Sequence, residues 1–156
     1  MLFAGATYLA SERHVGDLHA GAPELRPEAR FNKDITEITK RYAVTTDVLV
    51  VIAETGATGG INPCRSDYVM EAQDNLHWYL ENIPGVTKVI SLSSVAKRAL
   101  SGYAEGNLKW TYLPRNERAL AFATSVVDPS TGLINEACSI MPIYVFTEDH
   151  KATTIS

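Results

Sequence analysis

This sequence has no excess of positive charge. Its 14 Lys and Arg residues are outnumbered by 18 Asp and Glu residues, which gives a net charge of −4, and the basic residues form no cluster. Proteins that bind nucleic acid or an anionic membrane surface concentrate Lys and Arg in a patch that neutralises phosphate groups. The charge distribution therefore excludes nucleic acid as a partner.

The sequence also lacks a long apolar run, an internal repeat and a low-complexity tract. A helix that spans a bilayer needs about 20 consecutive apolar residues. Residues 1–10, MLFAGATYLA, carry no charge but are too few to span, and they lack the basic segment and the small-residue cleavage site of a secretory signal. We expect this segment to be the outer end of a transmembrane helix whose first half is absent. The alternative is a flexible or core-packed tail.

Cysteine is scarce, since Cys64 and Cys138 are the only two. Neither lies in a CxxC motif or near a pair of histidines, so a zinc site is not expected. Two alternatives remain open from the residues alone. The cysteines either form one disulfide, which would stabilise the fold by up to about 4.5 kcal/mol and place the domain outside the cytosol, or they are two separate buried thiols.

Polar motifs that resemble metal centres or catalytic sites occur, but each has a simpler explanation. His14, Asp17 and His19 are close in sequence, yet no regular spacing fixes them as metal ligands. Ser94 and Lys97 match the S-x-x-K pattern of acyl-transferring serine enzymes, but the companion S-D-N and K-T-G motifs are missing, and Ser94 is explained as a helix N-cap. We therefore predict no catalytic residue, metal or other cofactor. A small serine hydrolase based on Ser94 and Lys97 is kept as a competing hypothesis.

Residues 11–45 predict a connector followed by a short helix. Pro23 and Pro27 push the residues before them towards extended geometry, and residues 16–32 show neither the helical nor the strand period. We expect this stretch to be a stiff connector. Asn32 is predicted to cap a helix of about ten residues.

Residues 46–156 predict the folded lobe. Residues 47–53 form a continuous apolar run rich in β-branched side chains, which predicts a strand buried on both faces and central in its sheet. A helix capped by Ser66 and ending near Asn82 follows, and then a strand over residues 86–92. This order is a βαβ unit, for which parallel pairing and a right-handed crossover are expected.

The remaining elements complete most of a split βαβ pattern. They are short helices over residues 95–104 and 117–125, a strand over residues 139–146, and a helix that begins near His150. Asn116 is the expected cap of the second short helix, and Pro142 argues that the strand is an edge strand or contains a bulge. The order predicts an α+β fold of the split βαβ (ferredoxin-like, porter-subdomain) type with extra short helices, lacking its last strand.

Residues 15–32, VGDLHAGAPELRPEARFN, closely resemble a segment found just outside a transmembrane helix in a bacterial branch of the resistance-nodulation-division (RND) superfamily, among predicted exporters related to the MMPL transporters. In that branch the pattern reads roughly GD-x-x-x-GAPELRP-x-SRYN. Further matches are EGNLKW at residues 105–110, NEAC at residues 135–138 and DHKA at residues 149–152. The resemblance therefore covers nearly the whole chain in the right order. The sequence departs from the pattern at Ala29 and Phe31, where the family tends to have Ser and Tyr.

The resemblance implies that the chain is most of one periplasmic porter subdomain of a proton-driven exporter, and not an enzyme. Its location would be the bacterial inner membrane, with the domain facing the periplasm. The implied partners are the rest of the same transporter polypeptide with its transmembrane helices, a hydrophobic or amphiphilic small-molecule or lipid substrate and, as a further option, other copies in a homo-oligomer. The cysteines look like a pair in relatives, so the resemblance favours a disulfide between Cys64 and Cys138. The alternative is a stand-alone extracytoplasmic binding module that pairs through an open sheet edge.

Two sets of candidate functional residues follow from this resemblance. Trp110, Tyr112 and Phe122 are expected to provide an apolar, loop-borne substrate surface. The connector is expected to carry displacement from the membrane helix into the lobe, with Arg26 and Arg30 tying it to the lobe through carboxylates. The connector residues are Gly21, Pro23, Glu24, Arg26, Pro27, Arg30 and Asn32.

Overall fold

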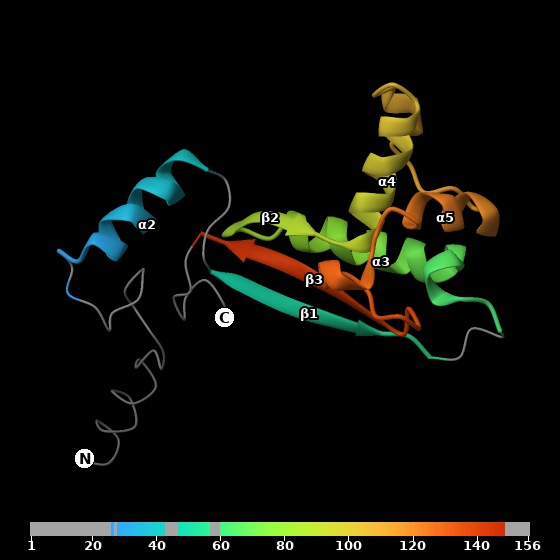
Figure 1. Ribbon diagram of the computed structural model, residues 1–156, viewed down its shortest axis with the longest axis horizontal. Helices are drawn as coiled ribbons and strands as arrows, with labels where there is room; N and C mark the ends of the chain where they lie inside the picture. The colour runs from blue at the N-terminus through green and yellow to red at the C-terminus, as the bar shows by residue number, and fades with distance from the viewer. Residues whose placement is uncertain (1–25, 27, 43–46, 57–59, 149–156) are drawn as a thin grey trace, which may run out of the picture.

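The computed structural model describes residues 26, 28–42, 47–56 and 60–148 (Figure 1). Its helices are α2 (Arg30–Arg41), α3 (Asp67–Glu81), α4 (Leu92–Tyr103) and α5 (Glu117–Thr124), and its strands are β1 (Val48–Glu54), β2 (Val86–Ile90) and β3 (Ile140–Thr147). Short 3₁₀ helices are η1 (Pro63–Arg65), η2 (Leu108–Trp110) and η3 (Pro129–Thr131). These elements confirm the α+β class. The predictions that lie outside the described residues concern residues 1–10, Gly21, Pro23, Glu24, Pro27 and the helix expected from His150.

The sheet has the strand order β1–β3–β2, and β3 pairs antiparallel with both of its neighbours. β1 and β2 therefore run in the same direction and are joined by α3, with β3 inserted between them (Figure 1). This is the split βαβ arrangement that the order of elements predicts. The expected direct parallel pairing of the first two strands is wrong, because β3 occupies the position between them.

The helix α3 covers one face of the sheet. Val89 of β2 and Ile143 and Val145 of β3 are buried there, and Leu76 and Leu80 of α3 pack against them. A second cluster extends from the sheet into α4 and α5, and it includes Met70, Leu92, Ala96, Leu100, Leu120, Ala123, Val127 and Met141. The core therefore lies between the sheet and its helices, as expected for a sheet with helices on one side.

β1 is an edge strand, and the prediction that it is central and buried on both faces is wrong. Val50 and Ile52 are 49% and 60% exposed, whereas Val51 packs against the cluster under α3. Successive side chains of a strand point to opposite faces, so Val50 and Ile52 lie on the sheet face opposite α3. A β-branched apolar run reports strand propensity, but it does not report where the strand sits in the sheet.

Pro142 lies in the middle strand, although proline predicts an edge strand or a bulge. The N–H of Thr55 donates to the carbonyl of Ser139, so Ser139 and every second residue after it in β3 form backbone hydrogen bonds with β1. Pro142 is not in this set, and its nitrogen therefore points away from β1. On the other side, the pairing with β2 ends at Ile90, opposite Tyr144, before Pro142 is reached. The missing N–H of Pro142 therefore costs the sheet no hydrogen bond.

Asn135 becomes the partner of β3 where β2 has ended. Its side-chain oxygen accepts a hydrogen bond from the N–H of Ile140 at 3.1 Å, and its own N–H donates to the carbonyl of Ile140 at 3.3 Å. Its Nδ2 also donates to Ser139 Oγ at 2.9 Å. These three bonds fix the point at which β3 begins.

Asparagine caps are confirmed at one helix and wrong at another. Asn116 Oδ1 accepts hydrogen bonds from the N–H groups at the start of α5, as predicted. Asn32 lies inside α2, whose N-cap is Ala29 and makes no side-chain cap bond. Asn32 Nδ2 instead donates to the carbonyl of Arg26 at 2.8 Å, so Asn32 secures the turn before the helix.

The substitution Asn135→Ala should lower the free energy of unfolding by about 0.5–1.5 kcal/mol, because it removes the side-chain oxygen that accepts from the N–H of Ile140. Urea unfolding measures this change. Glu136→Ala is the matched control, since Glu136 is the exposed neighbour, and it should stay within about 0.5 kcal/mol of the wild type. Equal stability of the two variants would contradict the role of Asn135.

Candidate functional site

The part of the chain that the structure describes contains neither a membrane-spanning helix nor a cluster of metal ligands. No helix in it is both long and apolar enough to cross a membrane. No three His, Cys, Asp or Glu side chains in it are grouped so that they could hold a metal ion. His14, Asp17 and His19 lie outside the described residues.

The predicted substrate residues form two ring pairs near α4. Trp110 and Tyr112 stack with ring centroids 6.1 Å apart. Phe122 of α5 instead contacts Tyr103, in the last turn of α4, with centroids 4.5 Å apart. All four rings are about half exposed. Tyr103 is not among the predicted substrate residues, although its position at the end of an apolar helical pattern is a signal that could identify it.

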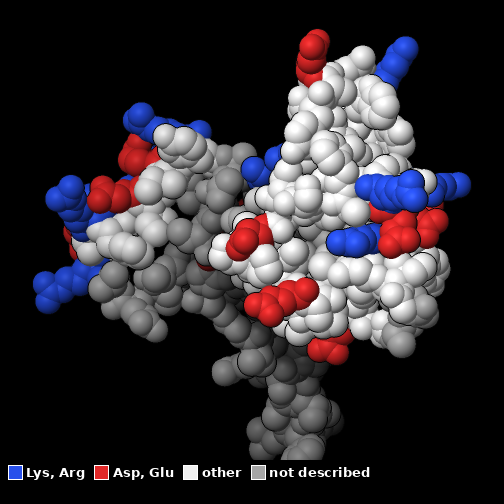
Figure 2. Space-filling model, turned by 45° about the vertical axis from the view of Figure 1, so that its right-hand side comes forward, with Lys and Arg blue, Asp and Glu red and all other residues white. Residues whose placement is uncertain are grey.

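A groove of about 530 Å³ runs along α4 beside this second ring pair. Its lining residues are Val95, Arg98, Ala99, Gly102, Tyr103 and Val126. Figure 2 shows that the surface over α4 carries few charged side chains, while acidic and basic groups gather below it. The volume lies within the range of roughly 300–1,000 Å³ found for small-molecule sites. A groove of this composition can hold an apolar body and can pair an anionic end with Arg98.

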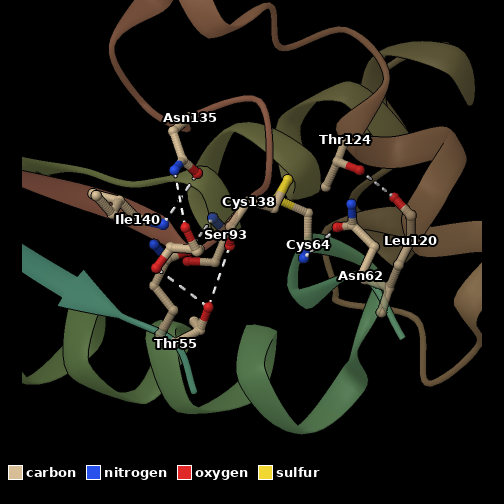
Figure 3. Close-up of a disulfide and its surroundings, with 11 residues drawn as sticks. Thr55, Asn62, Cys64, Ser93, Leu120, Thr124, Asn135, Cys138 and Ile140 are labelled. Carbon is tan, nitrogen blue, oxygen red and sulfur yellow. Dashed lines mark hydrogen bonds between the residues drawn. A yellow bond between two sulfur atoms is a disulfide. The ribbon is translucent and has the colours of Figure 1, made fainter. Parts of the chain in front are cut away.

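Cys64 of η1 and Cys138, just before β3, form a disulfide with their Cα atoms 5.7 Å apart (Figure 3). This confirms the pairing that the resemblance implied. Asn62 Oδ1 accepts a hydrogen bond from the N–H of Cys64 at 3.0 Å, and Thr55 Oγ1 donates to the carbonyl of Cys138 at 3.4 Å. The disulfide therefore ties the segment before α3 to the start of β3, and a hydrogen bond adds the end of β1.

Reduction of the disulfide should lower the free energy of unfolding by about 2–4 kcal/mol, because it frees a long loop in the unfolded chain. Urea unfolding with and without dithiothreitol measures the effect. The double variant Cys64→Ala with Cys138→Ala should unfold like the reduced wild type, and dithiothreitol should not change it. A wild type that is indifferent to dithiothreitol would show that the bond contributes nothing to stability.

Ser94 and Lys97 are engaged in structural contacts. Lys97 Nζ lies 2.7 Å from Asp74 Oδ1. Ser94 Oγ accepts a hydrogen bond from the N–H of Ser91 at 3.1 Å, and Ser91 Oγ accepts one from the N–H of Ser94 at 3.3 Å, and these two bonds form a capping box. The N-cap of α4 is therefore Ser91, and the prediction that Ser94 is the N-cap is wrong by one helical turn.

Ser91 also joins a buried polar network between α3 and α4. Its Oγ lies 2.9 Å from His77 Nδ1 and 2.8 Å from Ser93 Oγ, and the N–H of Ser93 donates to Gln73 Oε1 at 3.0 Å. His77 Nε2 lies 3.8 Å from Glu81 Oε2. The order Ser–His–Glu resembles the relay of serine hydrolases. Ser91 is fully buried and caps α4, so this network fixes the packing of two helices.

Burial is the main cause that lowers the pKa of His77 below its ordinary value of 6.5. The carboxylates of Glu81 and Asp74 act in the opposite direction, and the cations of Lys97 and Arg98 reinforce the lowering. The imidazole is therefore held in its neutral form, in which one nitrogen donates and the other accepts.

The fold should lose stability as the pH falls below about 6.5, because the unfolded chain then binds a proton that folded His77 resists. Urea midpoints at about pH 7.5 and pH 5.5 measure this loss. His77→Asn keeps a polar group near the position of Nδ1 but cannot titrate, so the variant should show a smaller loss between the two values. An identical loss in both proteins would assign the pH dependence to other groups.

The connector makes its described contacts within its own segment. Arg30 Nε forms an ion pair with Asp34 Oδ2 at 3.4 Å, inside α2, and both side chains are well exposed. This pair takes the place of the contact that was expected between Arg30 and a carboxylate of the lobe. Exposed pairs at this spacing contribute about 0.3–0.5 kcal/mol, so the ion pair supports the helix only weakly.

Comparisons with protein-family models, with curated proteins and with solved structures give no match. The resemblance to RND-superfamily exporters therefore stays a prediction.

Proposed function

We propose that this chain is an extracytoplasmic porter lobe of a proton-driven RND-type exporter at the bacterial inner membrane. The observation that carries the proposal is the sheet order β1–β3–β2, with parallel outer strands and α3 on one face. This order is the one expected of a split βαβ lobe. It agrees with the resemblance of residues 15–32, which lies in a different part of the chain.

The disulfide supports a location outside the cytosol. Cys64 and Cys138 are bonded and buried, and structural disulfides form and persist where the surroundings are oxidising. A lobe in the periplasm would meet this condition.

The groove along α4 and the aromatic rings near it support a role in the substrate path. Trp110, Tyr112 and Phe122 are exposed, and Arg98 provides the charge in an otherwise apolar groove. Aromatic side chains present large rigid apolar surfaces, which suit a hydrophobic or amphiphilic substrate or a lipid. Weak contacts of this kind let a transporter release its cargo again.

The packed lobe suits transport by rigid-body motion. Two core clusters hold α3, α4 and α5 against the sheet, so the lobe would move as one unit about a few hinge residues. Intramembrane carboxylates in the rest of the transporter polypeptide would carry the protons. The transmembrane helices of that polypeptide would anchor the connector.

A second candidate function rests on the edge of β1 that pairs with no strand among the described residues. The pairing with β3 leaves the N–H and C=O groups of Val48, Val50 and Ile52 directed away from β3. A stand-alone binding module would use this edge to accept a strand from a partner or from another copy of the chain. Such a module would elute from a sizing column as a dimer, or as a complex with an added extended peptide.

The reading frame around this chain gives the first test of the exporter proposal. The frame should encode several hydrophobic spans on both sides of the chain, because a proton-driven transporter needs a membrane portion. A frame without such spans would overturn the proposal and leave the binding module as the better account.

The second test measures export by cells that express the full transporter. The double variant Trp110→Ala with Tyr112→Ala should raise the accumulation of N-phenyl-1-naphthylamine several-fold, because two exposed substrate contacts are removed. Trp78→Ala is the matched control, since Trp78 is an exposed aromatic on α3 away from the two ring pairs, and it should export like the wild type. Equal accumulation in all three strains, at equal expression, would remove these rings from the substrate path.

A further inference from the structure

A second cavity adjoins the buried network between α3 and α4, because Gln73 belongs to both. The end of β1 and the N-terminal half of α3 enclose a cleft of about 530 Å³, into which β3 also contributes a side chain. Its apolar wall includes Val69 and Leu76 of α3 and Met141 of β3. A cleft of this size, with walls of this kind, matches the general form of small-molecule sites. It shares none of its residues with the groove along α4.

Gln73 lines this cleft, and its side chain carries an unsatisfied polar group. The side chain is 4% exposed, and its Oε1 accepts a hydrogen bond from the N–H of Ser93 at 3.0 Å. Only the oxygen of the amide can accept that bond, so the orientation of the amide is fixed. Its Nε2 is buried and has no hydrogen-bond partner among the described residues. A buried donor without a partner is costly, and an acceptor atom seated beside Gln73 would remove that cost.

The charge at the cleft decides which acceptor fits. Glu54 lines it and is exposed to solvent, so a carboxylate ligand would meet a like charge. A neutral carbonyl offers the same acceptor geometry without this repulsion. Thr55 also lines the cleft, but its hydroxyl already donates to the backbone carbonyls of Cys138 and Ser139. The amide of Gln73 is therefore the donor that remains for an acceptor atom of the ligand.

We propose that the cleft between β1 and α3 binds a neutral, largely apolar small molecule that places one carbonyl oxygen on the amide of Gln73. This site is separate from the substrate path along α4, and it does not depend on whether the chain belongs to an exporter. The binding energy would come from apolar contact with the walls, and the amide would select among apolar ligands.

Binding of Nile red by the full chain tests the site. Nile red is a neutral polycyclic dye with one carbonyl, and its fluorescence rises in an apolar environment. The wild type should bind one dye per chain with saturation. Ala72→Trp and Gly56→Phe fill the cleft from the helix wall and from the strand wall, and each should weaken binding by at least about tenfold. Gly56 tolerates a side chain, since a Cβ there meets no atom within 4 Å.

Two control variants separate the cleft from other apolar surfaces. Asn75→Trp places the same large ring on an exposed position of α3 outside the cleft, and it should bind Nile red like the wild type. Ile52→Asp disrupts the exposed sheet face and should also leave binding intact. Binding that survives both cleft variants, or that is lost with Ile52→Asp, would overturn the proposal. Circular dichroism of each variant establishes that it is folded.

A matched set of ligands tests the role of the amide without a substitution. Methyl 2-naphthyl ketone should displace Nile red at about tenfold lower concentration than 2-ethylnaphthalene, which has nearly the same shape but no acceptor. The 2-naphthoate anion should displace it less well than the ketone, because of Glu54. Equal potency of the ketone and the hydrocarbon would overturn the assignment of Gln73, and absence of Nile red binding would overturn the site itself. Neither result bears on export.

Discussion

All strand pairing in the described sheet passes through β3. β1 and β2 never pair with each other, so the backbone hydrogen bonds of both strands depend on where β3 lies. The start of β3 is held by Asn135, which completes its hydrogen bonding where β2 has ended, and by Cys138, which is bonded to Cys64. Cys138 adopts a positive φ of 54°, a conformation that costs free energy for residues other than glycine. The covalent bond and the asparagine together maintain this turn, and the register of the whole sheet follows from it.

The second constraint is polar and lies between α3 and α4. Gln73 and His77 project from α3 towards Ser91 and Ser93, which begin α4, and the four side chains are buried. Buried polar groups of this kind are costly unless they meet their partners, so the network favours one relative placement of the two helices. That placement sets the position of both cavities of the lobe. The groove lies along α4, and the cleft lies where α3 faces the end of β1.

Much of the fold could be predicted because it depends on local signals. The order of elements predicts the split βαβ arrangement, and the cap at Asn116 follows from side-chain chemistry within one turn, whereas Ser66 begins α3 without a side-chain cap bond. The place of β1 at the edge could not be predicted, because its apolar run has the same composition as a central strand. The prediction from Pro142 is wrong for a related reason. The nitrogen of Pro142 faces the side of β3 on which β2 has already ended, so a proline fits in this middle strand. The ring pair of Phe122 with Tyr103 and the cleft at Gln73 depend on packing between distant segments, which no local pattern reports.

The topology of β3 also governs the order in which the lobe can form during synthesis. A ribosome releases β1 and β2 well before their common partner, since Val48 pairs with Phe146. Until β3 emerges, two strands with open edges and apolar side chains have no native partner, and such intermediates aggregate readily. A nascent chain of this kind benefits from a holding chaperone over that interval. An oxidase that acts too early would also find Cys64 without Cys138, so closure of the disulfide must come late in biogenesis.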